Sequence, residues 1–224
     1  MDLLKNYSRV FFDFDGLLVD TENSHYKAYK KAIAHFGLLL NWSHKDFITI
    51  AHTSSYGLRE EIEKLFPTIF DQISWKDFYA LKSHSYLESL KDSPPLLMPG
   101  SKDLINKVQK NKTPHAVVTN SPKQQIEIIK FNHPILQKIP LWITREDYQQ
   151  AKPHPDGYLK AIEILGETNA MLGFEDSYKG IISLNRAKIT SVLVCQKNHP
   201  QLATPSEAIC DYVFSELNEI KEKG

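Results

Sequence analysis

Hydrophobic residues along this chain gather in short continuous runs, and most of the runs show no alternation with polar residues. A strand that is covered on both faces has no polar side, so uninterrupted apolar runs are typical of parallel strands in a layered fold. The pattern predicts four strong strands and two weaker ones, at residues 9–15, 115–120, 170–176 and 191–196, then 140–144 and 211–215.

The segments between these runs have the spacing of amphipathic helices. Strands that alternate with helices indicate a parallel sheet covered by helices, so we expect an α/β fold with a Rossmannoid parallel-sheet core. The predicted helices cover residues 101–110, 121–131, 154–165 and 177–187.

One long region between the first and second strands breaks this alternation, because it contains helical patterns only. Ser43 begins a sequence typical of a capping box, and Ser74 is placed to cap another helix. The region ends in the proline-rich segment "DSPPLLMPG". We therefore predict a core domain made of residues 1–19 and 94–224, with residues 20–93 inserted as an α-helical cap domain.

Composition narrows the class of protein without naming a function. The chain has 224 residues, of which 42% are hydrophobic, and it carries 27 basic and 27 acidic residues, so its formal net charge is zero. A balanced charge gives no support for nucleic-acid binding, which needs a basic excess. The cysteines, Cys195 and Cys210, have no metal or redox spacing and are expected to be reduced. With no apolar run near the ~20 residues of a membrane span and no signal-peptide pattern at the start, we expect a cytoplasmic monomer that binds no membrane.

Polar residues with catalytic potential follow three of the predicted strands. The first strand ends in Asp13 and Asp15, the second ends in residues 119–121 (Thr-Asn-Ser), and a later one ends in residues 175–176 (Glu-Asp), with Lys152 between the last two in the chain. Ligands of open parallel sheets bind beyond the carboxyl ends of the strands, so these groups are expected to converge on one rim. Several carboxylates on one rim repel each other unless a cation lies among them, and Mg²⁺ prefers oxygen ligands.

Each of these features also has a simpler explanation. The two acids beside Gly16 could belong to a turn, residues 119–121 could cap a helix, and residues 175–176 could interact with a helix dipole. A single lysine such as Lys152 is normally solvated. The combination of all four features in order favours a catalytic site over these separate explanations.

Four segments together resemble the haloacid dehalogenase superfamily of phosphohydrolases, in the branch with a helical cap after the first strand. The similarity covers nearly the whole chain, and it is greatest to the β-phosphoglucomutase-like and sugar-phosphate phosphatase group. The segments stand in the order of the family's four motifs: "DFDGLLVDTE", "VVTNS", "KPHPDGYLKA" and "GFEDSYKGI".

The resemblance implies roles for these residues. Asp13 is expected to be the nucleophile that becomes phosphorylated, and Asp15 the general acid and base. Thr119, Asn120 and Lys152 are expected to bind the transferring phosphoryl group. The cofactor implied is Mg²⁺, and the reaction implied is the hydrolysis of a small phosphomonoester, such as a sugar phosphate, through an aspartyl-phosphate.

The resemblance also implies a metal site and contacts from the cap. Mg²⁺ is expected to be held by Asp13, by Asp15 through its backbone carbonyl, and by Asp176 with Glu175. Residues of the cap expected to contact substrate are His25, His52 and Arg59, although each histidine could equally be a surface residue.

Two alternatives remain beside the phosphatase. Dehalogenases of the superfamily lack the second acid of the first motif, so Asp15 favours phosphoryl transfer. A β-phosphoglucomutase-like enzyme would need an arginine in the cap loop "AHTSSYG", where none occurs before Arg59. A non-catalytic protein that binds a phosphorylated metabolite would not need Asp15 as a proton carrier.

Overall fold

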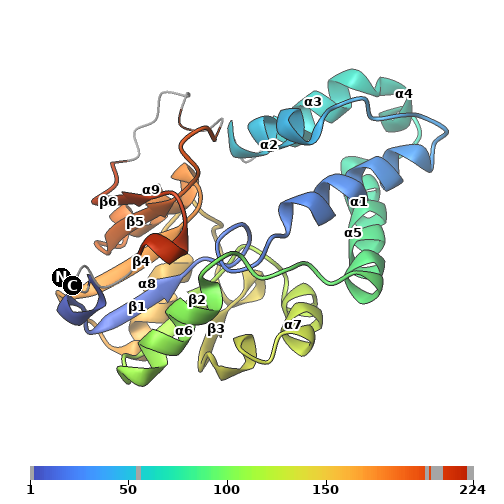
Figure 1. The fold of residues 1–224 in the computed structure, drawn as a ribbon. Helices are drawn as coiled ribbons and strands as arrows, with labels where there is room; N and C mark the ends of the chain where they lie inside the picture. The colour runs from blue at the N-terminus through green and yellow to red at the C-terminus, as the bar shows by residue number, and fades with distance from the viewer. Residues whose placement is uncertain (1–2, 54–56, 200–201, 203–208, 221–224) are drawn as a thin grey trace. The chain divides into compact units, whose positions relative to one another are not determined.

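The structure is a computed structural model, and it describes residues 3–53, 57–199, 202 and 209–220. Its six strands form one parallel sheet in the order β3-β2-β1-β4-β5-β6, with β1 and β4 at the centre (Figure 1). The strands are β1 (Arg9–Phe12), β2 (His115–Val118), β3 (Leu141–Ile143), β4 (Met171–Glu175), β5 (Thr190–Val194) and β6 (Tyr212–Phe214). This arrangement confirms the predicted α/β fold class.

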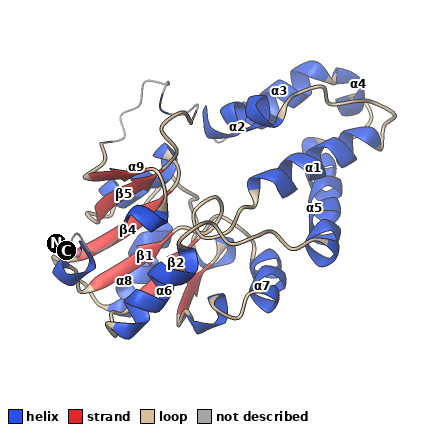
Figure 2. Cartoon of the chain, viewed as in Figure 1, coloured by secondary structure: helices blue, strands red, loops and turns tan. Residues whose placement is uncertain are grey.

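Helices cover both faces of the sheet (Figure 2). These helices are α6 (Ser101–Lys110), α7 (Lys123–Asn132), α8 (Asp156–Leu165) and α9 (Tyr178–Arg186), and short 3₁₀ turns lie at Leu3–Asn6, Leu136–Lys138, Arg145–Asp147 and Leu217–Glu219. The buried strand β1 shows why its run is continuously apolar. Phe11 packs edge-to-face on Tyr158 of α8, whereas Phe12 stacks on Phe174, because successive side chains point to opposite faces.

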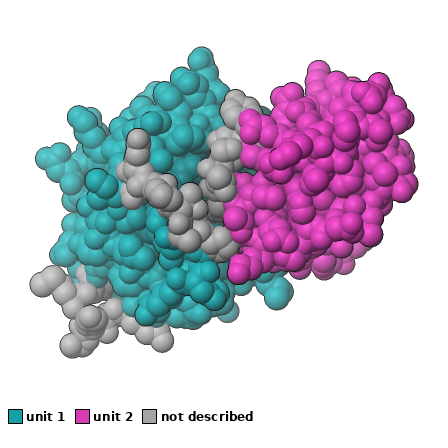
Figure 3. Space-filling model, turned by 90° about the horizontal axis from the view of Figure 1, so that it is seen from above, with its two compact units in different colours: residues 1–20, 96–224 teal, residues 21–95 magenta. Residues whose placement is uncertain are grey.

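The chain divides into two compact units, coloured separately in Figure 3. The first contains residues 1–20 and 96–224, and the second contains residues 21–95. The helices of the second unit are α1 (Glu22–Ala34), α2 (His44–Thr53), α3 (Gly57–Leu65), α4 (Pro67–Phe70) and α5 (Trp75–Asp92). The predicted insertion of an α-helical cap is therefore part of the observed fold.

The second unit has its own apolar core, to which Tyr29, Ile33, Phe47, Ile62 and Phe78 contribute. The predicted helix starts are confirmed. Ser43 and Asp46 exchange the hydrogen bonds of a capping box before α2, and the Ser74 side chain accepts from the backbone N–H of Asp77 at the start of α5.

The segments that enter and leave this insertion lie side by side within the first unit. The Asp20 N–H donates to the Leu96 carbonyl over 2.9 Å, and the Met98 N–H donates to the Leu18 carbonyl over 2.9 Å. Backbone pairing of this kind holds the two ends of the insertion next to each other.

Two further expectations can be compared with the structure. Cys195 and Cys210 are both free thiols, as predicted. No helix among the described residues combines the length and the apolar character needed to cross a bilayer.

Candidate active site

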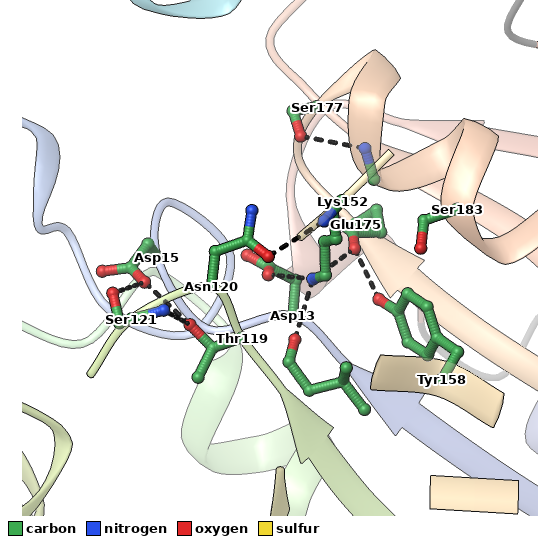
Figure 4. A network of polar contacts seen from close by, with 12 residues as sticks. Asp13, Asp15, Thr119, Asn120, Ser121, Lys152, Tyr158, Glu175, Ser177 and Ser183 are labelled. Carbon is green, nitrogen blue, oxygen red and sulfur yellow. Dashed lines mark hydrogen bonds and ion pairs between the residues drawn. The ribbon is translucent and has the colours of Figure 1, made fainter. Parts of the chain in front are cut away.

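Asp13 is the first residue after β1, and it lies in a buried ion-pair cluster at the carboxyl end of the sheet (Figure 4). The Lys152 ammonium donates to Asp13 Oδ1, to Glu175 Oε1 over 2.7 Å and to the Val118 carbonyl over 2.8 Å. Lys152 is only 5% exposed, so its three N–H donors are used entirely inside the protein. The convergence expected from the sequence is thus present for Asp13, Lys152 and Glu175.

Burial and charge act against each other in this cluster. Burial and then the Glu175 charge raise the pKa of Asp13, the Lys152 ammonium lowers it, and the net effect is a pKa of about 8. Burial also raises the pKa of Glu175, with Lys152 opposing the change. For Lys152, burial lowers the pKa, but the Asp13 and Glu175 carboxylates raise it and prevail, so the amine stays protonated.

Carboxylate oxygens of Asp13, Glu175 and Asp176 lie within 4.8 Å of one another. One ammonium cannot neutralise three carboxylates, and Glu175 Oε2 is buried without a hydrogen-bond partner in the described structure. A buried carboxylate oxygen without a partner is costly unless a cation binds it. The donor set therefore fits a hard divalent cation.

Two glycines leave room for these carboxylates. A Cβ atom at Gly180 would overlap Glu175 Oε2, and a Cβ atom at Gly16 would overlap Asp176 Oδ2. Gly16 also has φ +78°, a conformation that other residues adopt only with strain. Gly16 lies in the turn after β1, and Gly180 lies in α9. The backbone can approach the carboxylates closely at these positions because glycine has no side chain.

Asp15 belongs to a different part of the site. Its carboxylate accepts hydrogen bonds from Ser121 Oγ over 2.6 Å and from Thr119 Oγ1 over 3.1 Å, and Gln125 in turn donates to Ser121 Oγ. In Figure 4, Asp13 lies between this hydroxyl-bound carboxylate and the Lys152 cluster. The Asp15 side chain is not one of the three grouped carboxylates, which leaves its backbone carbonyl as the predicted metal ligand.

Asn120 lies beside Lys152 with its amide oxygen engaged. Asn120 Oδ1 accepts from the Lys152 backbone N–H over 3.1 Å and contacts the Tyr148 hydroxyl at 2.8 Å. The structure thus brings together all of the core residues that the sequence singled out.

The predicted cap residues have separate surroundings in the second unit. His25 Nδ1 lies 2.8 Å from Lys82 Nζ, and the imidazole stacks on Tyr86 with ring centroids 4.1 Å apart. Arg59 forms an exposed ion pair with Glu63 and packs over Trp75. The backbone of His52 is in α2, but its side chain lies outside the described residues. Contacts of these residues with substrate remain a prediction.

Sequence reasoning missed two tyrosines of the site. The Tyr158 hydroxyl donates to Glu175 Oε1, the same oxygen that Lys152 binds. The Tyr148 hydroxyl reaches the carbonyl of Thr119. Tyr158 is also an apolar position of α8, so its pattern indicates packing only. Tyr158 is close to Lys152 in the same motif, which suggests that it lies near the site. The motif does not show which group its hydroxyl contacts.

Comparisons with known proteins agree with this geometry. Residues 10–194 match the haloacid dehalogenase-like hydrolase family. The chain is 29% identical over 191 residues to protein CbbY of Rhodobacter capsulatus, covering 82% of this chain and 83% of that protein. It is 26% identical to (DL)-glycerol-3-phosphatase 2 of Arabidopsis thaliana, covering 96% and 89%.

Solved structures show the same fold. The crystal structure of CbbY from Rhodobacter sphaeroides in complex with phosphate matches with a TM-score of 0.76 at 18% identity, covering 96% of each chain. At this identity the likeness establishes the architecture, and residue roles have to be argued from the site itself.

Proposed function

The chain belongs to the haloacid dehalogenase-like hydrolase family, and from this membership we propose that it is a Mg²⁺-dependent phosphatase of a small phosphomonoester. The observation that carries the proposal is the buried cluster at the end of β1, where the carboxylates of Asp13, Glu175 and Asp176 gather beside the Lys152 ammonium. The family and the phosphatase relatives support a phosphoric monoester hydrolase. A sugar phosphate or similar metabolite is the substrate class that we propose.

Asp13 is the proposed nucleophile. An oxygen of its carboxylate attacks phosphorus, and the bond from phosphorus to the leaving oxygen breaks, which gives an aspartyl-phosphate and an alcohol. Burial raises the pKa of Asp13, and Mg²⁺ bound beside it would lower that pKa and favour the ionised carboxylate that attacks. Asp13 directly follows β1, a central strand of the sheet, and this rigid support holds its carboxylate in one position.

Asp15 is the proposed general acid and base. It donates a proton to the leaving alcohol in the first step and removes a proton from the attacking water in the second, which restores the Asp13 carboxylate and releases phosphate. The hydroxyls of Thr119 and Ser121 hold the Asp15 carboxylate apart from the Lys152 cluster. This separation supports different roles for the two acids.

Lys152, Asn120 and Thr119 are the proposed phosphoryl-binding groups. The ammonium offsets negative charge beside Asp13, and the Asn120 amide can donate to a phosphoryl oxygen. Mg²⁺ held by Asp13, Asp176, Glu175 and the Asp15 carbonyl would supply further positive charge at the reacting group. The unpartnered Glu175 Oε2 supports this assignment of the metal.

The test is phosphate release by purified protein from a panel of sugar phosphates, nucleotides and other phosphomonoesters, with Mg²⁺ and then with EDTA. We expect metal-dependent release, and a loss of at least about 10³-fold in Asp13→Asn. Asp103→Asn, on the exposed surface of α6, is the matched control and should retain full activity. Near-normal activity in Asp13→Asn would refute the mechanism.

A second assay of the purified protein distinguishes a phosphatase from a mutase. Incubated with β-glucose 1-phosphate and a bisphosphate primer, a phosphatase releases inorganic phosphate. Formation of glucose 6-phosphate without free phosphate would identify a mutase instead.

A further inference from the structure

Tyr148 links the two chain segments that carry the proposed phosphoryl-binding groups. It lies just after the 3₁₀ turn Arg145–Asp147, in the segment that leads to Lys152. Its hydroxyl lies 2.7 Å from the Thr119 carbonyl oxygen and 2.8 Å from Asn120 Oδ1. A single side chain therefore bridges the segment after β2 and the segment before α8.

The hydrogen bonds around Asn120 determine which way its amide faces. The Lys152 backbone N–H donates to Asn120 Oδ1, and the Tyr148 hydroxyl lies 2.8 Å from the same atom, with its one proton shared between Oδ1 and the Thr119 carbonyl oxygen. A flipped amide would place N–H groups against the Lys152 N–H donor, which is unfavourable. The amide nitrogen is then free of these two contacts, and in Figure 4 it projects away from the dashed line that joins the Asn120 oxygen to Lys152.

The Tyr148 ring is itself held in place. A Cβ atom at Gly157, in the first turn of α8, would lie 3.2 Å from Tyr148 Cε1, so the ring packs directly against the glycine backbone. The Arg145 guanidinium lies 5.3 Å from the ring centroid and donates to the Tyr148 carbonyl over 2.8 Å. Burial raises the pKa of Tyr148 to about 12, so the hydroxyl keeps its proton at neutral pH.

We propose that Tyr148 is a positioning residue for phosphoryl binding: its hydroxyl orients the Asn120 amide so that Nδ2 donates to an oxygen of the substrate. The inference rests on the proposed function of this site. In this proposal Tyr148 acts through Asn120, and the Thr119 carbonyl holds the hydroxyl in place.

The test is Tyr148→Phe in the full chain, which removes the hydroxyl and keeps the ring. We expect kcat/KM to fall by about tenfold, the effect of one well-placed hydrogen bond, with KM and the inhibition constant of inorganic phosphate both rising. The matched control is Tyr7→Phe, which removes a hydroxyl bonded to Thr190 and Tyr212 before β1, at the opposite end of that strand. Kinetic constants of Tyr148→Phe within twofold of this control would overturn the proposal.

A double-mutant cycle tests whether the effect passes through Asn120. In an Asn120→Ala background, adding Tyr148→Phe should change kcat/KM by less than twofold. An undiminished tenfold loss in that background would show that Tyr148 acts by another route and would refute the proposal.

Failure of the proposed function can be recognised separately. If the wild-type protein hydrolyses no phosphomonoester, the phosphatase proposal fails, and calorimetric binding of inorganic phosphate becomes the readout. Weaker binding in Tyr148→Phe than in Tyr7→Phe would still support the positioning role, and equal binding would exclude it.

Discussion

Each of the two units buries a lysine, and the two lysines are accommodated in different ways. Lys152 in the first unit is 5% exposed and forms ion pairs with Asp13 and Glu175. Lys82 on α5 is 3% exposed, and its ammonium lies about 5 Å from the ring centroids of Tyr29, Tyr79 and Tyr86 and beside His25 Nδ1.

The difference between the two surroundings indicates which of the two buried ammonium groups takes part in a reaction. Asp13 and Glu175 are held against the Lys152 ammonium in a place where water cannot solvate them, which costs stability but maintains a reactive site. The rings of Tyr29, Tyr79 and Tyr86 attract the Lys82 ammonium and also contribute apolar packing. The groups around Lys152 are thus mainly carboxylates, and those around Lys82 are mainly aromatic rings.

The largest effect is expected from Lys152→Met. Removal of the ammonium leaves Asp13 and Glu175 buried without their cation, which should cost about 3–5 kcal/mol of unfolding free energy in metal-free protein. Activity should fall by about 10²–10³-fold, because charge on the phosphoryl oxygens loses a partner. Urea unfolding and phosphate release measure the two effects. An unchanged unfolding free energy would show that the ion pairs do not hold this cluster.

Lys82→Met makes the same substitution in the other surroundings and should have a much smaller effect. The methionine side chain can pack on the same three rings, so we expect the unfolding free energy to change by less than about 1.5 kcal/mol. Urea unfolding beside Lys152→Met gives a direct comparison. A loss as large as that of Lys152→Met would mean that charge, and not ring packing, stabilises Lys82.

Ser74→Ala weakens the helix that carries Lys82 without touching the rings. Loss of the hydrogen bond from the Asp77 N–H to Ser74 should cost about 1 kcal/mol. Thermal unfolding should show the loss, and kcat should not change on substrates already known to turn over. A large fall in kcat would show that α5 affects catalysis through its stability.

His115 offers a third case, a basic group that is buried in the neutral form. Burial lowers its pKa, Nδ1 bonds the Thr113 carbonyl, and the buried Nε2 has no hydrogen-bond partner in the described structure. The unfolded chain takes up a proton near pH 6.5 and the folded chain only at lower pH, so this contribution to stability is present above pH 6.5 and is lost as the pH falls.

The smallest effect is therefore a change of pH dependence in His115→Asn. The melting temperature of the wild-type protein should drop more between pH 7.5 and pH 5 than that of the variant, whatever their absolute values. Equal drops would show that His115 does not contribute to acid sensitivity.

The order of elements and the site's charged residues could be predicted from the sequence, because both depend on local patterns. A continuous apolar run that ends in Asp13 is enough to place that acid at the carboxyl end of a strand. The same logic located Asp176, whereas Lys152 was identified by its place in the third motif of the family resemblance. The lateral order of the strands was not predictable, since it depends on long-range pairing such as that of Phe11 with Ala116 and Gly173.

The hydrogen bonds of the two tyrosine hydroxyls could not be predicted from the sequence for a related reason. The sequence does not show whether the hydroxyls of Tyr148 and Tyr158 face solvent or a buried acceptor. Their function depends on the position of partners such as Thr119 and Glu175, which only the folded chain brings near. Likewise, nothing local indicates that Gly180 has to be glycine because of a carboxylate five residues earlier.

The pairing of Asp20 with Leu96 has a consequence for how such proteins diversify. Because the backbone leaves and re-enters the core at hydrogen-bonding distance, residues 21–95 form a cassette whose ends already meet. A short turn could close the gap, and an unrelated insert with neighbouring ends could be transplanted there without altering the register of the six strands. Evolution and laboratory recombination can thus exchange the whole insert as one module while the sheet is inherited intact.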